Sequence, residues 1–326
     1  MPNTTATPSN SFWKPTSSKG FLFVLLGAGL WGTDAIFRKG LATTVPTSVV
    51  VWVEQLIPLL CLLPYALRGT RRAIATFNAK DWIFLIMIGC GASTVATYLY
   101  TRAFTYGIYT TPVLLQQVQP LFAIVGARIL LRERLHPRFG FFVIAALIGS
   151  YFIAFAQPSA PSFHLLAPAL LTLSAAGIWG LGTVFGRSLG AKVPFNELTA
   201  LRVLFGLFAA TILVAVQHDF GFLAHLSGSS DRALLLMSLF PGLFALLLYY
   251  TGLRATPASV ATLAELAFPI TALLVNYFDF NIKGKANLSN WQWMGVAILI
   301  GTITTMGLDR REESLAGVDV ELLPVG

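Results

Sequence analysis

Ten long apolar runs, separated by short polar segments, occupy most of this 326-residue sequence. We place them at residues 20–37, 48–67, 81–101, 110–131, 139–156, 165–187, 196–216, 233–253, 257–279 and 291–308. As α-helices rising about 1.5 Å per residue, such runs are long enough to cross about 30 Å of hydrocarbon. Only 11% of the residues are charged, against roughly 25% in soluble domains. The sequence therefore predicts an all-α polytopic membrane protein with ten transmembrane helices.

Other classes of protein fit the sequence poorly. A soluble enzyme needs a polar surface, and an outer-membrane barrel shows short alternating strands in place of unbroken apolar runs. A net charge of +8 raises the question of nucleic acid, but basic residues in a membrane protein are expected at the cytoplasmic ends of helices. Cys61 and Cys90 both lie inside apolar runs, which disfavours a disulfide framework or a thiolate metal site. We expect no cofactor, no bound metal and no nucleic-acid partner.

The distribution of Lys and Arg predicts the orientation of the chain in the membrane. Fifteen of them fall on the side of the N-terminus, six on the opposite side, and Arg202 lies within the seventh segment. Because cytoplasmic loops carry the excess of positive charge, we expect both termini on the cytoplasmic side of the inner membrane. Residues 1–19, rich in Ser, Thr, Pro and Asn, are predicted to form a disordered cytoplasmic tail, and residues 309–326 a second cytoplasmic tail.

The chain also repeats itself. The matched pairs are Trp31 with Trp179, Tyr100 with Tyr249 and Pro120 with Pro269, at offsets of 148 or 149 residues. The repeats therefore cover residues 20–156 and 165–308, with five predicted helices in each. Because five is odd, the second repeat must enter the membrane upside down relative to the first. In proteins built from such inverted repeats, the binding site lies near the midplane between the repeats.

The order and duplication of these motifs resemble a known family. Each half begins with a Gly-x-Trp-Gly-like helix, and the fourth segment continues from Pro120 to Glu133. This pattern resembles the EamA-type members of the drug/metabolite transporter superfamily, and in length and layout the YddG-like exporters of aromatic and other amino acids. The resemblance implies a secondary transporter, and not an enzyme, that exports aromatic and other neutral amino acids by alternating access through a central cavity.

Four ionisable residues lie inside predicted membrane segments, where each costs about 2.5–3.5 kcal/mol unless it is paired or hydrated. Asp34 lies one helical turn from Arg38, so we expect either an interfacial ion pair or a role in gating or proton coupling. Glu54 and Arg202 occupy matching places in the two halves, and each is expected to find a structural partner, the other being one candidate. Glu265 matches Gln116, so it either faces the cavity or serves packing alone.

Polar and aromatic residues mark the predicted cavity. Polar residues gathered on one face of the fourth and ninth segments should point away from lipid; the alternative is hydrogen bonding between helices without contact to cargo. Trp31 and Trp179 lie well inside their segments, and several tyrosines lie toward segment ends. These rings either anchor the chain at the membrane surface or offer faces for stacking. The predicted cavity residues are Trp31, Thr94, Tyr98, Gln116, Gln119, Trp179, Tyr249, Tyr250 and Glu265, with Asp34, Glu54 and Arg202 for gating or charge pairing.

The charges within the segments also limit the cargo. Only Arg202 is available at mid-depth to hold a phosphate, which argues against multiply anionic cargo. A zwitterion needs an acceptor for its ammonium and donors for its carboxylate, and a cavity lined by Gln, Thr and Tyr with one Glu can provide both. Together with the family resemblance, on which the hypothesis mainly rests, this favours export of amino acids. Two alternatives remain open: a proton-coupled exporter of cationic drugs or metabolites, and a membrane enzyme or sensor. The sequence leaves the oligomeric state and the coupling open.

Overall fold

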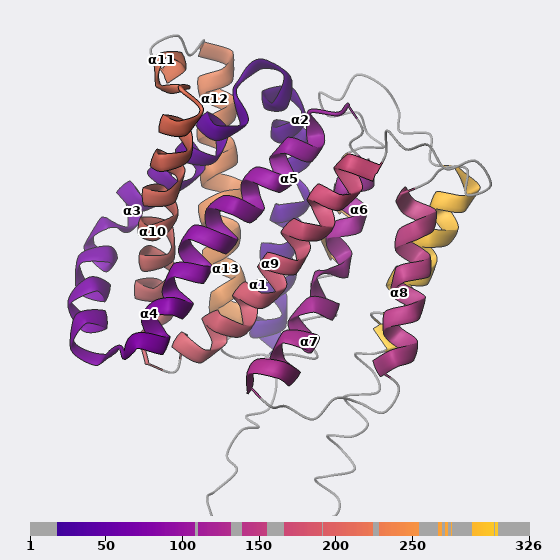
Figure 1. Ribbon diagram of the computed structural model, residues 1–326, viewed down its shortest axis with the longest axis horizontal. Coiled ribbons are helices and arrows are strands. Elements are labelled where there is room, and N and C mark those ends of the chain that lie inside the picture. Colours follow the sequence, from indigo (N-terminus) through magenta and orange to yellow (C-terminus); the bar gives the residue numbers. More distant parts are fainter. Residues whose placement is uncertain are drawn as a thin grey trace, which may run out of the picture.

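The chain is almost wholly helical. The computed structural model describes residues 18–107, 110–131, 139–154, 166–190, 192–223, 228–253, 267–268, 271–272, 275, 289–302 and 304–305. Every regular element within these ranges is a helix, and no strand occurs in them (Figure 1). The predicted all-α class is therefore confirmed. Glu265 and residues 309–326 lie outside the described ranges, as do residues 1–17 of the predicted N-terminal tail.

Six helical segments in the described part of the chain are long and apolar enough to cross a membrane. They are Gly20–Thr44, Thr47–Thr76, Ala79–Phe104, Leu166–Gly190, Phe195–Val216 and Ser230–Gly252. Large apolar side chains on these segments are exposed, including Leu60 at 62% and Ile74 at 70%, as surfaces that face lipid require. The polytopic membrane fold is confirmed. The count of ten helices stays a prediction, because most of the predicted ninth segment lies outside the described residues.

The helices that contain the first two predicted segments extend beyond the apolar runs. Helix α1 (Ser18–Gly32) begins inside the predicted tail, and α2 (Asp34–Thr44) follows after Thr33 and continues beyond the predicted end at residue 37. Helix α3 (Thr47–Thr76) likewise passes the predicted end at residue 67. Hydropathy detects where a helix leaves the apolar layer and not where it stops, because polar residues continue a helix well. Both extensions therefore escaped the sequence prediction.

The third membrane segment of each half contains a π-helix. In the first half the order is α4 (Ala79–Ile86), η1 (Met87–Val95) and α5 (Ala96–Phe104). In the second half it is α12 (Gly228–Met237), η4 (Ser238–Phe244) and α13 (Ala245–Leu253). At the 149-residue offset of the sequence repeat, η4 falls on the last seven residues of η1. Such wide turns are rare and frequently mark functional sites.

The remaining described elements complete both halves. They are α6 (Thr110–Leu115), η2 (Gln116–Val118), α7 (Gln119–Leu131), α8 (Phe139–Ala154), α9 (Leu166–Gly190), α10 (Phe195–Val216) and α11 (Phe220–Leu223). Residues 290–302 are also helical. This last helix packs beside α8 at the edge of the molecule (Figure 1), where Phe152 stacks on Trp291 with ring centroids 5.4 Å apart.

Glycines bring helices of opposite halves into backbone contact. A Cβ on Gly32 would lie 2.6 Å from the Phe268 carbonyl oxygen, and a Cβ on Gly180 would lie 2.8 Å from the Gln119 carbonyl oxygen. Gly32 matches Gly180 in the repeat, and Phe268 matches Gln119. Each half therefore makes the same contact with the other, which is the reciprocity that a two-fold relation produces. The inversion of that relation across the membrane stays a prediction.

Candidate functional site

A pocket of about 230 Å³ lies between the two halves. Nine of the residues predicted from the sequence line it: Trp31, Asp34, Glu54, Gln116, Gln119, Trp179, Arg202, Tyr249 and Tyr250. Further lining residues include Arg38, Gln55, Ser93, Thr97 and Tyr100. The π-helix η4 contributes Pro241 and Gly242 to the same wall. The described elements thus bring residues more than 200 positions apart in the chain together around one cavity.

Two aromatic pairs form the apolar part of the pocket. Trp31 on α1 packs against Tyr249 on α13, with ring centroids 4.7 Å apart. Trp179 on α9 packs against Tyr100 on α5, with ring centroids 5.3 Å apart. Because Trp31 matches Trp179 and Tyr100 matches Tyr249, each pair joins one half to the other in the same way. The repeat detected in the sequence therefore builds two equivalent aromatic walls.

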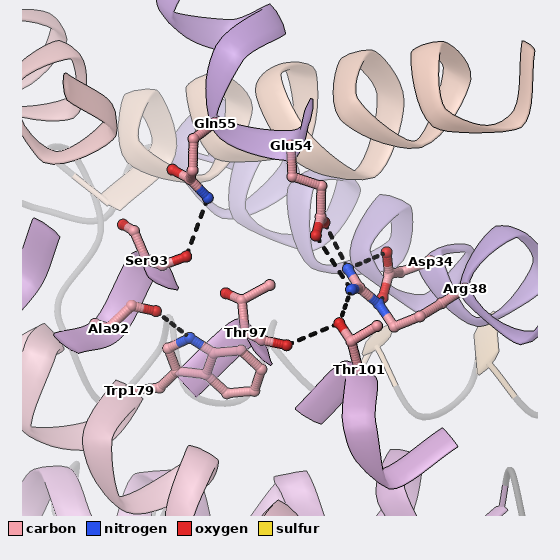
Figure 2. Close-up of polar contacts among 9 residues, drawn as sticks. All are labelled: Asp34, Arg38, Glu54, Gln55, Ala92, Ser93, Thr97, Thr101 and Trp179. Atoms are coloured by element: carbon pink, nitrogen blue, oxygen red, sulfur yellow. Dashed lines mark hydrogen bonds and ion pairs between the residues drawn. The ribbon is translucent and has the colours of Figure 1, made fainter. Parts of the chain in front are cut away.

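The π-helix η1 holds these walls in place through its carbonyl groups. The indole N–H of Trp179 donates to the Ala92 carbonyl oxygen at 2.7 Å, and Nε2 of Gln55 donates to the Ser93 carbonyl oxygen at 3.0 Å (Figure 2). A wide turn leaves backbone carbonyls without their usual helical donor, and a buried carbonyl needs another partner. Here α9 and α3 supply that partner. The orientation of the Trp179 ring thus depends on the irregular backbone opposite it.

A charged cluster occupies the pocket wall formed by α2, α3 and α5 (Figure 2). Nε of Arg38 lies 2.5 Å from Asp34 Oδ2, and Nη2 of Arg38 lies 2.5 Å from Glu54 Oε1. Nη1 of Arg38 also donates to the Thr101 hydroxyl, and the guanidinium lies 5.7 Å from the centre of the Tyr100 ring. The side chain of Arg38 is only 4% exposed. We call Asp34, Arg38 and Glu54 the acidic–arginine cluster.

The cluster corrects two sequence expectations. Arg38, which hydropathy places in an outer loop, is buried within α2 because that helix continues to Thr44. Glu54 pairs with Arg38 and not with Arg202. Arg202 instead donates from Nε to the Ser93 hydroxyl at 2.7 Å and from Nη1 to the Tyr250 hydroxyl at 3.1 Å. Glu54 and Arg202, which match each other in the repeat, therefore line the same pocket but bind different partners.

Gln116 presents an unsatisfied acceptor at the pocket. Its Oε1 atom is buried and has no hydrogen-bond partner among the described residues. It begins the short 3-10 turn η2, which interrupts the helix between α6 and α7. Gln119, one turn later, also lines the pocket. A buried acceptor without a partner costs about 1–3 kcal/mol, so the position is ready to accept a donor from a bound molecule.

Two predicted cavity residues lie outside this pocket. Thr94 is buried, and its hydroxyl donates to the Gly206 carbonyl oxygen at 2.7 Å, which ties η1 to α10. Tyr98 accepts from Nε2 of Gln217 at 2.9 Å beyond the end of α10. Both side chains are engaged in contacts between helices. Among the described residues, no group of three or more His, Cys, Asp or Glu side chains is arranged to hold a metal ion.

Sequence reasoning missed Gln55 and Thr101, and it did not place Arg38 in the cavity. Arg38 carried a usable signal, because it follows Asp34 by four residues and would share its helix face if the helix continued. Thr101 carried a weaker one as the repeat counterpart of Tyr250. Gln55 donates to the carbonyl group of Ser93 in the π-helix η1. The spacing of apolar residues in the sequence does not predict a π-helix, so this contact could not be predicted.

Comparison with known proteins gives consistent matches along the chain. The EamA-like transporter family matches twice, over residues 18–155 and 166–308. The riboflavin transporter ImpX of Fusobacterium nucleatum is 31% identical over 276 residues, covering 82% of this chain and 90% of its own. The uncharacterized inner membrane transporter YicL of Salmonella typhimurium is 22% identical over 311 residues, covering 92% of this chain and 99% of its own. A solved crystal structure shares the fold with a TM-score of 0.61 at 20% identity, covering 91% of this chain and 100% of its own.

Proposed function

Because the chain belongs to the EamA-like transporter family, we propose that its pocket holds the transported solute, and that this solute is a planar, uncharged aromatic heterocycle of the class to which riboflavin belongs. The observation that carries the proposal is the pair of aromatic walls, Trp31 with Tyr249 and Trp179 with Tyr100, on one cavity. Each ring pair offers about 0.5–1.5 kcal/mol of stacking beyond its buried area. The name of the 31% identical Fusobacterium relative supports the same class.

The polar groups of the pocket also suit such a heterocycle. The buried Oε1 of Gln116 needs a donor, and a ring N–H of an amide or imide type supplies one in the plane of the heterocycle. Gln119 stands one turn away and offers both a donor and an acceptor. A few placed polar groups within a mainly aromatic lining are typical of small-molecule sites.

The charge balance of the pocket favours cargo without net charge. Among the described lining residues, Asp34 and Glu54 carry two negative charges, and Arg38 and Arg202 carry two positive charges. A multiply anionic solute would need an excess of Arg or Lys, and a cation would need an excess of carboxylate. We propose that the cargo crosses the inner membrane by alternating access between the two halves, with both termini in the cytoplasm.

A second candidate is export of aromatic amino acids. Two observations favour it. The pocket charges are separated, with one surplus carboxylate in the acidic–arginine cluster and an Arg202 whose hydrogen-bond partners Ser93 and Tyr250 are neutral. An amino acid carries the complementary ammonium and carboxylate. The volume of about 230 Å³ also lies below the roughly 300 Å³ at which pockets for drug-sized ligands begin.

Counterflow in proteoliposomes separates the two candidates. Vesicles loaded with unlabelled riboflavin are expected to take up labelled riboflavin faster than empty-vesicle controls, and unlabelled tryptophan or phenylalanine in tenfold excess should not compete. Trp179→Ala is expected to lower this uptake by about tenfold, since one stacking contact of about 1.4 kcal/mol corresponds to that factor. Trp52→Ala is the matched control, because Trp52 also donates its indole N–H, to Thr211 at 3.0 Å, but does not line the pocket.

Each outcome decides between the proposals. Riboflavin uptake that Trp179→Ala lowers and Trp52→Ala spares would support the heterocycle and the aromatic walls together. Uptake of tryptophan or phenylalanine without riboflavin uptake would replace the first candidate by the second. Equal losses in the two tryptophan variants would mean that the aromatic pairs support packing and not cargo binding.

A further inference from the structure

The acidic–arginine cluster carries more negative than positive charge in a buried place. Asp34 and Glu54 share the single guanidinium of Arg38, through distances of 2.5 Å to each carboxylate. The side chains of Asp34 and Glu54 are 15% and 11% exposed. With both carboxylates ionised, the cluster holds one net negative charge inside a membrane protein, where an uncompensated charge is expensive. Binding one proton would remove that charge.

The groups around Glu54 leave this surplus in place. The other titratable or charged residues on the elements of the cluster and on those packed against it are Lys19 on α1, Lys39 on α2, Cys61, Tyr65, Arg68, Arg71 and Arg72 on α3, Cys90 on η1, Tyr98, Tyr100 and Arg102 on α5, Glu197 and Arg202 on α10, Asp219 before α11, and Asp231 and Arg232 on α12. Arg102, Asp231 and Arg232 are exposed. Asp219 accepts from Ser48, Glu197 pairs with Arg72, and Arg202 bonds to Ser93 and Tyr250. None of these described contacts joins a second cation to Glu54.

The fold does not require such a cluster for packing. At the repeat offset of 148 residues, Asp34 corresponds to Gly182, Arg38 to Gly186, and Glu54 to Arg202. The second half therefore builds the equivalent helices with two glycines where the first half has an ion pair. A Cβ on Gly186 would meet no described atom within 4 Å. A cluster that exists in one half only, beside the pocket, calls for a functional role.

We propose that Glu54 is a proton-binding site through which the protein couples cargo movement to the movement of a proton. Asp34 and Arg38 lie four residues apart on α2 and move together, whereas Glu54 belongs to α3. A proton on Glu54 leaves Asp34 and Arg38 as a balanced pair and weakens the tie between α2 and α3. Because Glu54 lines the pocket, the proton and the cargo reach the same cavity. This inference rests on the proposed transport function.

The test uses proteoliposomes with the full chain and riboflavin as the probe, with the membrane potential clamped. One proton per cargo and a pH difference of one unit sustain about a tenfold concentration ratio, because one unit equals about 1.4 kcal/mol. We expect wild-type protein to accumulate riboflavin several-fold with one polarity of the pH gradient and not with the other. Glu54→Gln is expected to retain measurable counterflow but to reach a concentration ratio of about one.

Two further variants keep the test decisive. Asp34→Asn removes the surplus charge through the other carboxylate, so it should also abolish accumulation, and it serves if Glu54→Gln does not fold. Asp81→Asn is the matched control, because it removes a carboxylate that is 5% exposed and paired with Lys192 at 2.5 Å outside the pocket, and it should accumulate riboflavin like wild type.

The outcomes distinguish this inference from the proposed function. Wild-type counterflow without accumulation under either gradient would overturn proton coupling and leave the transport function intact. Accumulation that persists in both cluster variants would place the proton elsewhere and overturn the assignment to Glu54. Absence of counterflow for riboflavin and for amino acids alike would remove the proposed function itself.

Discussion

Replacing Gly27 by alanine should destabilise the protein, although alanine is ordinarily the better helix former. Gly27 lies where α1 crosses α13, and a Cβ there would stand 2.7 Å from the backbone nitrogen of Tyr249 and 2.8 Å from the carbonyl oxygen of Ala245. Both obstacles are backbone atoms, so no side-chain rotation relieves the contact. The two helices must separate, and the pair of Trp31 and Tyr249, with ring centroids 4.7 Å apart, separates with them.

The size of the effect is the difference between an overpacking cost and a gain in helix propensity, and Gly186 provides the matched control. Overpacking a close contact costs about 1–3 kcal/mol, and the gain from replacing a helical glycine by alanine is about 0.5–1 kcal/mol. Gly27→Ala should therefore lose roughly 0.5–2 kcal/mol of stability. Gly186→Ala, within α9 and with no described atom within 4 Å of its Cβ, should show only the gain of about 0.5–1 kcal/mol. The two identical substitutions are thus expected to change stability in opposite directions.

The assay is thermal unfolding of both variants in the same detergent, followed by counterflow in proteoliposomes. We expect the midpoint of Gly27→Ala to fall below wild type, that of Gly186→Ala to equal or exceed it, and counterflow to drop only in Gly27→Ala. Equal or higher stability of Gly27→Ala would refute the close approach of α1 and α13, and with it the reasoning that glycines set the spacing of the aromatic walls.

Three further substitutions test the buried polar groups. Arg38→Met should lose about 3–5 kcal/mol, because it leaves two buried carboxylates without their cation, whereas Arg72→Met, whose side chain is 47% exposed, should lose far less in the same thermal unfolding assay. Thr94→Val should lose about 1 kcal/mol with its hydrogen bond to Gly206 and keep wild-type counterflow; a selective loss of counterflow would return Thr94 to the pocket. Gln116→Leu removes an unsatisfied acceptor, so it should raise the unfolding midpoint while weakening riboflavin counterflow, and a lower midpoint would contradict the absence of a partner.

Much of the architecture could be read from the sequence because its signals are local or repeated. Apolar runs predicted the membrane helices. The matched positions of Trp31 with Trp179 and Tyr100 with Tyr249 predicted a pocket shared by the two halves. A duplicated motif constrains where its copies meet, so nine predicted residues fall on one cavity.

The site predictions that the structure corrects have a common physical cause. Side-chain pairing depends on where each helix ends and on which way its residues face around the helix axis. Arg38 was assigned to a loop because the apolar run stops at Phe37, while the helix continues. Glu54 then found Arg38, and Arg202 found neutral hydroxyl groups. Thr94 is a polar residue inside an apolar segment, as a cavity residue would be, but its side chain faces α10. Position along a segment is thus predictable, whereas the direction of a side chain around its axis requires the neighbouring helices.

The π-helices η1 and η4 affect the direction in which the tyrosine side chains after them leave the helix axis. A turn closed by an i→i+5 bond spends one residue more than an α-helical turn, and one residue corresponds to about 100° of rotation in a helix of 3.6 residues per turn. Tyr100 and Tyr249 both lie downstream of such a turn on the same segment. In an uninterrupted α-helix, each ring would leave its helix axis in a different direction. The direction of both aromatic rings therefore depends on the π-helical backbone that precedes them in each half.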